Sequence, residues 1–290
     1  MQARRGYFGS VGEWVIFSAP EFRESKMTAI ATVMGPWGVL MAADGRMCLS
    51  EAARPYASAE VLAKETDHAQ KLFPIVGPDR AMVYGLAGSI ANDDFTFDLR
   101  SELHRLASEL APQRWEDLLG YINALVEPVA MAITDAGHFP LKGESKSGGL
   151  NIAEAMFAGC FGSLIFLLTV EFAHSGGMCR ARIVEVRHQS RNPICQICYG
   201  SRAVAQRMYD RRRGHAPIAG SPFARYIHDL GDSPTANDAE RFAVGYIEAC
   251  CSPTGLQLDP DGCRGIGGHI HVATVEPGGG FQWIRPPIAP

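Results

Sequence analysis

The sequence lacks the motifs of several large enzyme classes. It contains no Walker phosphate loop, no dinucleotide-binding fingerprint and no zinc-protease motif, which excludes those three kinds of site. A formal net charge of -4 argues against a general affinity for nucleic acids or anionic membranes. No internal repeat and no clear linker divides the 290 residues. One globular domain without a nucleic-acid partner is therefore expected.

Long apolar segments are also missing. The most apolar stretch, Ala155–Val170, is too short to span a membrane comfortably and contains two glycines, so it is interpreted as buried strand. Near the N-terminus, Arg4 and Arg5 are not followed by the apolar core of a signal peptide. We therefore expect a cytoplasmic protein without a membrane partner.

The eight cysteines show no disulfide-framework spacing. Cys195 and Cys198 have the C-x-x-C spacing but no second pair at a zinc-like distance, so reduced structural thiols are favoured. His269 and His271 alternate along an expected strand and could share a metal, yet no third ligand stands at a matching spacing. No metal and no other cofactor is expected.

What the sequence does contain is material for a core and a clear order of elements. Hydrophobic residues make up 47% and charged residues 20%, as in ordinary globular proteins. Short apolar runs separated by turn residues predict three β-hairpins. They are Thr28–Val33 with Val39–Ala43, Lys71–Ile75 with Ala81–Leu86, and Ser163–Ala173 with Cys179–Val186.

Helical spacing occurs in two blocks between and after these hairpins. Phe95, Leu99, Leu103, Leu106 and Leu110 lie on one helical face, and a second helix runs from Trp115 to about Thr134 with an interruption near Pro128. The later elements are a strand at Ile194–Tyr199, helices from about Ala203 and over Asn237–Cys250, and strands at His269–Val275 and Phe281–Ile284. Because strands cluster with strands and helices with helices, two packed sheets covered by helices are favoured.

One set of residues along this order of elements could form a catalytic site. A threonine hydroxyl needs a base to take its proton, and a threonine that begins a chain can use its own α-amino group. A nearby lysine disfavours the protonated amine, and an aspartate can hold that lysine in place. Thr28 opens the first expected strand, Asp44 follows the second, and Lys71 opens the third.

At these positions the sequence resembles the β-type subunits of proteasomes, including their bacterial relatives. The matching segments are Thr28–Arg46, Lys71–Ile75, Tyr84–Ser89, Tyr199–Ser201 and Ile266–Gly268. They occur in the family's order and extend the resemblance from Thr28 to the C-terminus. The resemblance implies an α+β fold, the four-layer αββα sandwich of N-terminal-nucleophile hydrolases. It also implies assembly into a homo-oligomeric ring or similar particle.

The resemblance assigns a role to each matched residue. Thr28 would be nucleophile and amine base, Lys71 would tune the amine, and Asp44 would orient Lys71. The backbone N–H of Gly85 would serve the oxyanion hole, and Ser201 would support the amine. The family's late aspartate aligns with Cys263, and Asp261 or Asp259 would have to replace it.

The start of the chain departs from the family pattern. Met27 precedes Thr28, where self-processing members carry glycine. Residues 1–27 are therefore expected to be an extra segment, a propeptide or a mis-assigned start, ahead of one hydrolase domain at 28–290. A start at Met27 followed by removal of that methionine would expose Thr28 without autolysis. The stretch between Asp44 and Lys71 is longer than expected and predicts an insertion.

The expected activity is hydrolysis of peptide or amide bonds, in peptide or protein substrates, through an acyl-enzyme on Thr28. Two alternatives remain: a small-molecule amidase, and a catalytically silent subunit that retains residues 1–27. Each residue also has a structural interpretation. Thr28 could only begin a strand, Asp44 a turn, Lys71 could protect a sheet edge, Gly85 could allow close packing, and Ser201 could cap a helix.

Overall fold

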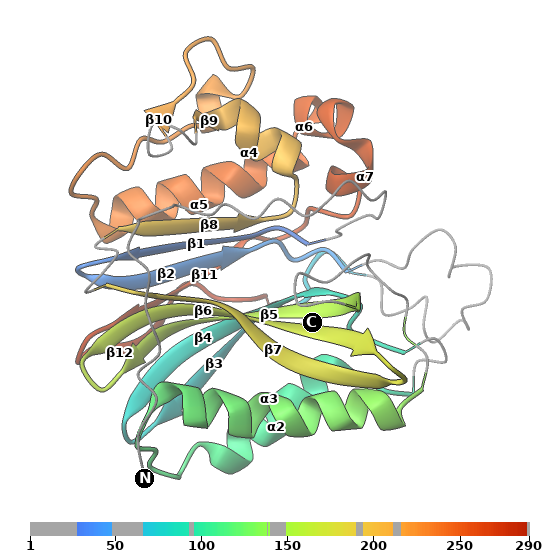
Figure 1. The fold of residues 1–290 in the computed structure, drawn as a ribbon. Helices are drawn as coiled ribbons and strands as arrows, with labels where there is room; N and C mark the ends of the chain where they lie inside the picture. Colours follow the sequence, from blue (N-terminus) through green and yellow to red (C-terminus); the bar gives the residue numbers. More distant parts are fainter. Residues whose placement is uncertain are drawn as a thin grey trace, which may run out of the picture.

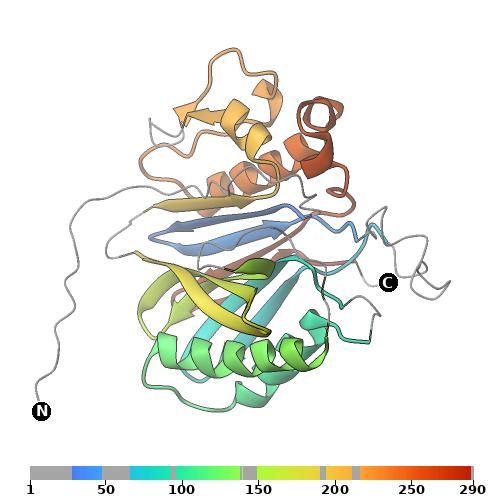
Figure 2. The same cartoon turned by 45° about the vertical axis from the view of Figure 1, so that its right-hand side comes forward.

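The computed structural model describes residues 28–47, 66–92, 96–137, 139, 149–189, 194–210 and 216–288. Two five-stranded antiparallel sheets pack face to face, and helices cover their outer faces (Figure 1). The same four layers are visible after the molecule is turned (Figure 2). The predicted α+β, four-layer αββα architecture is confirmed. The expected segment at 1–27 lies outside the described residues.

The first sheet has the strand order β12-β11-β2-β1-β8. Its strands are β1 (Ile30–Gly35), β2 (Gly38–Ala43), β8 (Cys195–Tyr199), β11 (His271–Glu276) and β12 (Gly280–Arg285). On its outer side lie α4 (Arg202–Met208), α5 (Ala236–Cys251), α6 (Pro253–Leu258) and α7 (Pro260–Cys263), together with β9 (Tyr209–Asp210), β10 (Ala216–Pro217) and η3 (Ala224–Tyr226) (Figure 1).

The second sheet has the strand order β3-β4-β5-β6-β7. Its strands are β3 (Leu72–Gly77), β4 (Arg80–Gly88), β5 (Leu150–Phe161), β6 (Leu164–Ser175) and β7 (Met178–His188). Its outer face is covered by α2 (Leu99–Leu110) and α3 (Leu118–Asp135) (Figure 1). All three predicted hairpins are therefore present, as β1–β2, β3–β4 and β6–β7.

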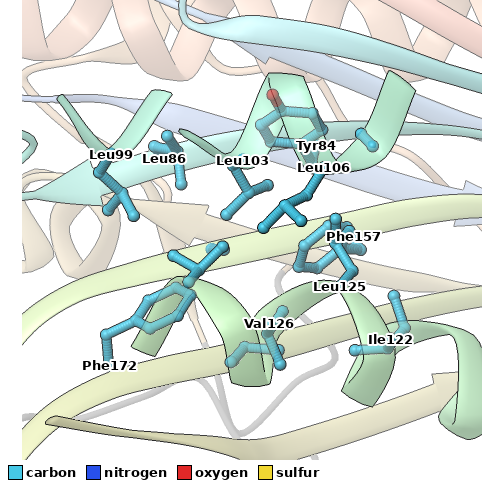
Figure 3. Close-up of a cluster of buried hydrophobic side chains, with 14 of the residues drawn as sticks. Tyr84, Leu86, Leu99, Leu103, Leu106, Ile122, Leu125, Val126, Phe157 and Phe172 are labelled. Atoms are coloured by element: carbon cyan, nitrogen blue, oxygen red, sulfur yellow. The ribbon is translucent and has the colours of Figure 1, made fainter. Parts of the chain in front are cut away.

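Three hydrophobic clusters fill the spaces between the four layers. In one, leucines of α2 and α3 pack against Tyr84, Phe157 and Phe172 of the second sheet (Figure 3). A second cluster joins the first sheet to α5, and a third lies between the two sheets. Because successive strand residues face opposite sides, β1 supplies Ile30 to the inner cluster and Ala31 to the outer one.

The stretch Ala155–Val170 is buried strand, as expected, divided between β5 and β6 by a turn in which Gly162 adopts φ 55°. One predicted element differs from the structure. Helix α3 continues through Pro128 without the expected interruption. That helix is long and apolar enough to cross a membrane, but its buried side packs in the cluster shared with the second sheet.

Candidate active site

Thr28, Asp44 and Lys71 meet at one end of the two sheets. Thr28 precedes β1, Asp44 follows β2, and the β1–β2 register sets these two ends side by side. The Asp44 N–H donates to the carbonyl of Ala29 at 3.1 Å. Lys71 immediately precedes β3 of the other sheet. The predicted trio is thus brought together from two sheets.

Lys71 bridges the aspartate and the threonine. Its Nζ lies 2.9 Å from Asp44 Oδ1 and 3.4 Å from Thr28 Oγ1. The side chain of Asp44 is fully buried, and that of Lys71 is 10% exposed. A buried ion pair of this kind has a fixed geometry, because moving either group leaves the other charge without a partner.

The carboxylate of Asp44 accepts from the backbone as well. Oδ1 accepts the Ala29 N–H at 2.8 Å, and Oδ2 accepts those of Arg46 at 3.2 Å and Gly267 at 3.1 Å. Burial raises the pKa of Asp44, while the Lys71 ammonium and the backbone N–H groups of Ala29 and Gly267 oppose that rise. Asp44 therefore fixes Lys71, the start of β1 and the segment before β11 at one point.

A pocket of about 80 Å³ opens beside Thr28. It is lined by Thr28, Arg46, Met47, Ala69, Lys71, Phe73, Leu86, Gly88, Ile90 and Arg100. Both arginines have carboxylate partners: Arg46 contacts Asp67 at 2.7 Å, and Arg100 contacts Asp98 at 2.6 Å. The rest of the lining is largely apolar.

Gly85, the predicted oxyanion-hole residue, does not line this pocket. It pairs with Leu72 on one side and Met156 on the other, and an added Cβ would lie 2.9 Å from Ile30 Cδ1 between the sheets. In β4 the odd-numbered residues are bonded to β5, as Gly162 N to Asp79 O and Ser89 N to Ile152 O show. The N–H of Gly85 is therefore directed at β5 and not at this pocket.

Gly88 is the glycine that the structure places beside Thr28. It lines the pocket and has φ 106°, a conformation that favours glycine. As an even-numbered residue of β4 its N–H points away from β5, on the side of β3. β3 begins at Leu72, opposite Gly85, so no β3 residue pairs with Gly88. Its N–H therefore has no partner in β3 among the described residues.

Ser201 lies on the other side of Thr28. The β1–β8 register pairs Ile30 with Tyr199, and its continuation sets Ser201 opposite Thr28. Ser201 is buried, accepts the Val204 N–H at 3.1 Å as the N-cap of α4, and donates to Asp259 Oδ2 at 2.6 Å. Ser201 is therefore a helix cap, and its support of the Thr28 amine stays a prediction.

The acidic partner of Ser201 is Asp259, whereas Asp261 is exposed. Asp259 is the N-cap of α7 and accepts the Gly262 N–H at 2.9 Å, which holds its carboxylate toward Ser201. Asp261 belongs to the first turn of that helix and is exposed to solvent. Of the two aspartates weighed for this place, Asp259 is the one that contacts Ser201. Cys263 is buried nearby, and hydrogen bonding with Cys250 and Ser201 lowers its pKa.

His271 takes part in the site through the backbone of Lys71. Its Nε2 accepts the N–H groups of Lys71 at 3.0 Å and Leu72 at 3.2 Å. His269 instead contacts the Pro286 carbonyl at 2.9 Å, and the two imidazole centroids are 6.4 Å apart. Within the described part of the chain, no group of three potential metal ligands is found.

The C-x-x-C pair is not a redox site. Cys195 lies in the cluster between the sheets, whereas Cys198 packs on the helix side of the same strand. Because β8 is a regular strand, residues three apart point to opposite faces. The two thiols are free, and burial raises the pKa of each to about 12.

The sequence did not single out three residues that the structure places in this region: Gly88, Asp259 and His271. The signal for Gly88 was a glycine followed by serine at the end of a strand pattern. Asp259 was weighed beside Asp261, and its position before Pro260 is typical of a helix N-cap. His271 had no signal of its own, because its partners are backbone N–H groups some 200 positions away.

No protein-family model matches the chain, and no curated protein matches it. Solved structures of Anbu proteins are similar to it. That of the helical assembly of the Anbu complex from Pseudomonas aeruginosa is 12% identical, with TM-score 0.48, over 90% of this chain and 88% of the other. The Anbu (Gly-1) mutant from Hyphomicrobium sp. strain MC1 is 15% identical, with TM-score 0.47, over 86% and 82%. Anbu (ancestral beta-subunit) from Yersinia bercovieri is 12% identical, with TM-score 0.46, over 85% and 81%.

Proposed function

We propose that this chain, once it begins at Thr28, is a threonine-type N-terminal-nucleophile hydrolase that cleaves peptide or amide bonds. The observation that carries the proposal is the contact of Lys71 Nζ with both Thr28 Oγ1, at 3.4 Å, and Asp44 Oδ1, at 2.9 Å. A buried lysine held against a threonine hydroxyl at the mouth of a pocket is an arrangement suited to nucleophilic catalysis.

In the first step the Thr28 hydroxyl attacks the substrate carbonyl and passes its proton to the free α-amino group. The carbon–nitrogen bond then breaks, and the protonated amine returns that proton to the leaving nitrogen. Water attacks the resulting ester with the same amine as base, which releases the acid and restores Thr28. The positive charge of Lys71, next to Thr28, disfavours protonation of the amine, so that the amine is unprotonated and able to accept a proton at neutral pH.

Gly88 is assigned to the developing negative charge on the carbonyl oxygen. Its N–H is directed to the side of β4 on which the pocket lies, and N–H groups aimed at an oxyanion stabilise the transition state. Ser201, which donates to Asp259 at 2.6 Å, is assigned to support the amine of Thr28. The role of Gly88 replaces the one first expected for Gly85.

The pocket supports an apolar group on the acyl side of the scissile bond. Ala69, Phe73, Leu86 and Ile90 contribute its apolar wall, and a volume of about 80 Å³ suits a short aliphatic side chain. Peptides with leucine or valine before the scissile bond are the first substrates to test. Assembly into a homo-oligomer is part of the proposal and is supported by the sequence resemblance.

The test compares two forms of the protein, one beginning at Met1 and one at Thr28, after intact-mass measurement of each. A β-lactone that acylates threonine should add its mass to the second form alone, and Thr28→Ala should abolish the addition. Leucyl or valyl amide substrates should be hydrolysed by the same form.

A form shown by mass to begin at Thr28 that neither reacts nor hydrolyses either substrate would contradict the proposal and favour a silent subunit. Hydrolysis of small amides without cleavage of peptides would favour the amidase alternative.

A further inference from the structure

His271 is the first residue of β11, and its side chain points between the two sheets. It pairs with Ala43, the residue before Asp44. The next residues on the same face of β11, Ala273 and Val275, belong to the cluster between the sheets. The imidazole is 1% exposed, and its ring packs edge-on against Trp283 at 6.3 Å between centroids. Its location is therefore fixed by the first sheet.

The imidazole reaches across to the start of β3 in the second sheet. Leu72 pairs with Gly85, whose N–H is directed at β5, so the Leu72 N–H faces away from β4. Among the described strands β3 is at the edge of its sheet, so none of them accepts that donor. His271 Nε2 accepts it at 3.2 Å, together with the Lys71 N–H at 3.0 Å.

Nε2 can accept only if it carries no proton, and the surroundings keep it so. Burial, the Lys71 charge and the neighbouring His269 lower the pKa of His271 to about 3. Asp44, which follows the residue paired with His271, is already paired with the Lys71 ammonium at 2.9 Å. At neutral pH the ring is an uncharged acceptor with its proton on Nδ1.

We infer that His271 is a positioning residue for Lys71: it fixes the lysine backbone to the first sheet while Asp44 fixes the ammonium. Both anchors come from adjacent positions of the paired strands β2 and β11. Lys71 is thus held at both ends of its side chain, although it belongs to the other sheet. The catalytic consequence rests on the proposed function. The positioning itself rests only on three contacts: those of His271 with the N–H groups of Lys71 and Leu72, and that of Asp44 with the Lys71 ammonium.

Three variants of the form that begins at Thr28 test this. His271→Phe keeps a ring against Trp283 but removes the acceptor, and His271→Gln places a carbonyl oxygen at a similar reach. His269→Phe is the matched control, since that ring contacts Pro286 and not Lys71. The measurements are the rate of β-lactone labelling against pH and the hydrogen exchange of the Lys71 and Leu72 amides by NMR.

His271→Phe should react roughly 10- to 100-fold more slowly, the cost of a small misplacement of a catalytic group. The acid limb of its pH–rate profile should move to higher pH, because a displaced Lys71 no longer disfavours the protonated amine. His271→Gln should return the acid limb to its wild-type pH and restore most of the labelling rate. His269→Phe should match wild type in both. A general loss of stability would lower the rate without moving the limb.

A folded His271→Phe protein with the wild-type rate and limb would overturn the inference, as would a His271→Gln protein as slow as the phenylalanine variant. If wild type itself is not labelled, the proposed function fails, and amide exchange decides the inference. Protection lost with phenylalanine and kept with glutamine supports it; protection unchanged with phenylalanine overturns it. If the phenylalanine variant does not fold, a protonated Nε2 in the wild-type nitrogen spectrum overturns it.

Discussion

The two sides of Thr28 are built differently. On one side, Asp44, Lys71 and His271 lie between the sheets at the ends of strands, and all three are buried. On the other, Ser201 and Asp259 are the N-caps of the short helices α4 and α7, outside the first sheet. The first side is an ionic network with few ways to rearrange. The second depends on hydrogen bonds that also cap helices, so its changes should be smaller.

Asp44→Asn should produce the largest change. It leaves the Lys71 ammonium without a charge partner and turns an amide NH2 toward N–H donors, so the unfolding free energy should fall by about 3–5 kcal/mol. Labelling of Thr28 should be lost. Urea unfolding at pH 7 measures the stability, with Asp67→Asn as control, because the exposed Arg46–Asp67 pair is worth about 0–1 kcal/mol.

An Asp44→Asn protein that stays within about 1 kcal/mol of wild type, as exposed pairs do, would remove the distinction between the two sides.

The two glycines of β4 sharpen the comparison within the buried side. Gly88→Ala would place a Cβ 2.7 Å from the Ile152 carbonyl at φ 106°, so the strand must shift and labelling should slow by roughly 10²–10³-fold. Gly85→Ala meets the flexible ends of Ile30 and Leu72. It should cost about 1–3 kcal/mol of stability, with the labelling rate per folded molecule unchanged. The opposite pattern would restore Gly85 as the oxyanion residue.

The strand-borne part of the site was the part that the sequence could predict. Thr28, Asp44 and Lys71 each adjoin a short apolar run with turn residues between, and hairpin pairing brings such ends together. The sequence indicated Gly85 for the oxyanion hole and could not show which strand its N–H faces. That direction alternates from residue to residue along β4, so Gly85 and Gly88, three residues apart, direct their N–H groups to opposite sides. The exact choice between Asp259 and Asp261 depends on which residue begins a four-residue helix. His271 could not be predicted, because no side-chain pattern records a contact with backbone N–H groups.

The pH dependence of stability should separate His271 from the other buried groups. Its pKa is about 3 when folded, against 6.5 as the ordinary value, so between these limits the unfolded chain binds a proton that the folded one does not. Folding should therefore lose stability as pH falls from 6.5 toward 3, by about 1.4 kcal/mol per pH unit from this group. His271→Gln removes that slope.

Urea unfolding at pH 7 and at pH 4.5 should show wild type losing more than the glutamine variant. Equal losses would mean that the imidazole is not the neutral acceptor.

The helix-cap side should give the smallest effect. Asn caps helices as well as Asp, so Asp259→Asn should keep the N-cap of α7 and lower stability by no more than about 1 kcal/mol, the cost of a weaker hydrogen bond with Ser201. The Ser201 hydroxyl then donates to a neutral oxygen in place of a carboxylate, a loss of about 1 kcal/mol that should slow labelling roughly fivefold. Asp261→Asn, in the same helix but exposed, should change neither quantity. If Asp261→Asn slowed labelling and Asp259→Asn did not, the acidic partner of Ser201 would be the residue first expected, and the cap geometry of α7 would have no bearing on Thr28.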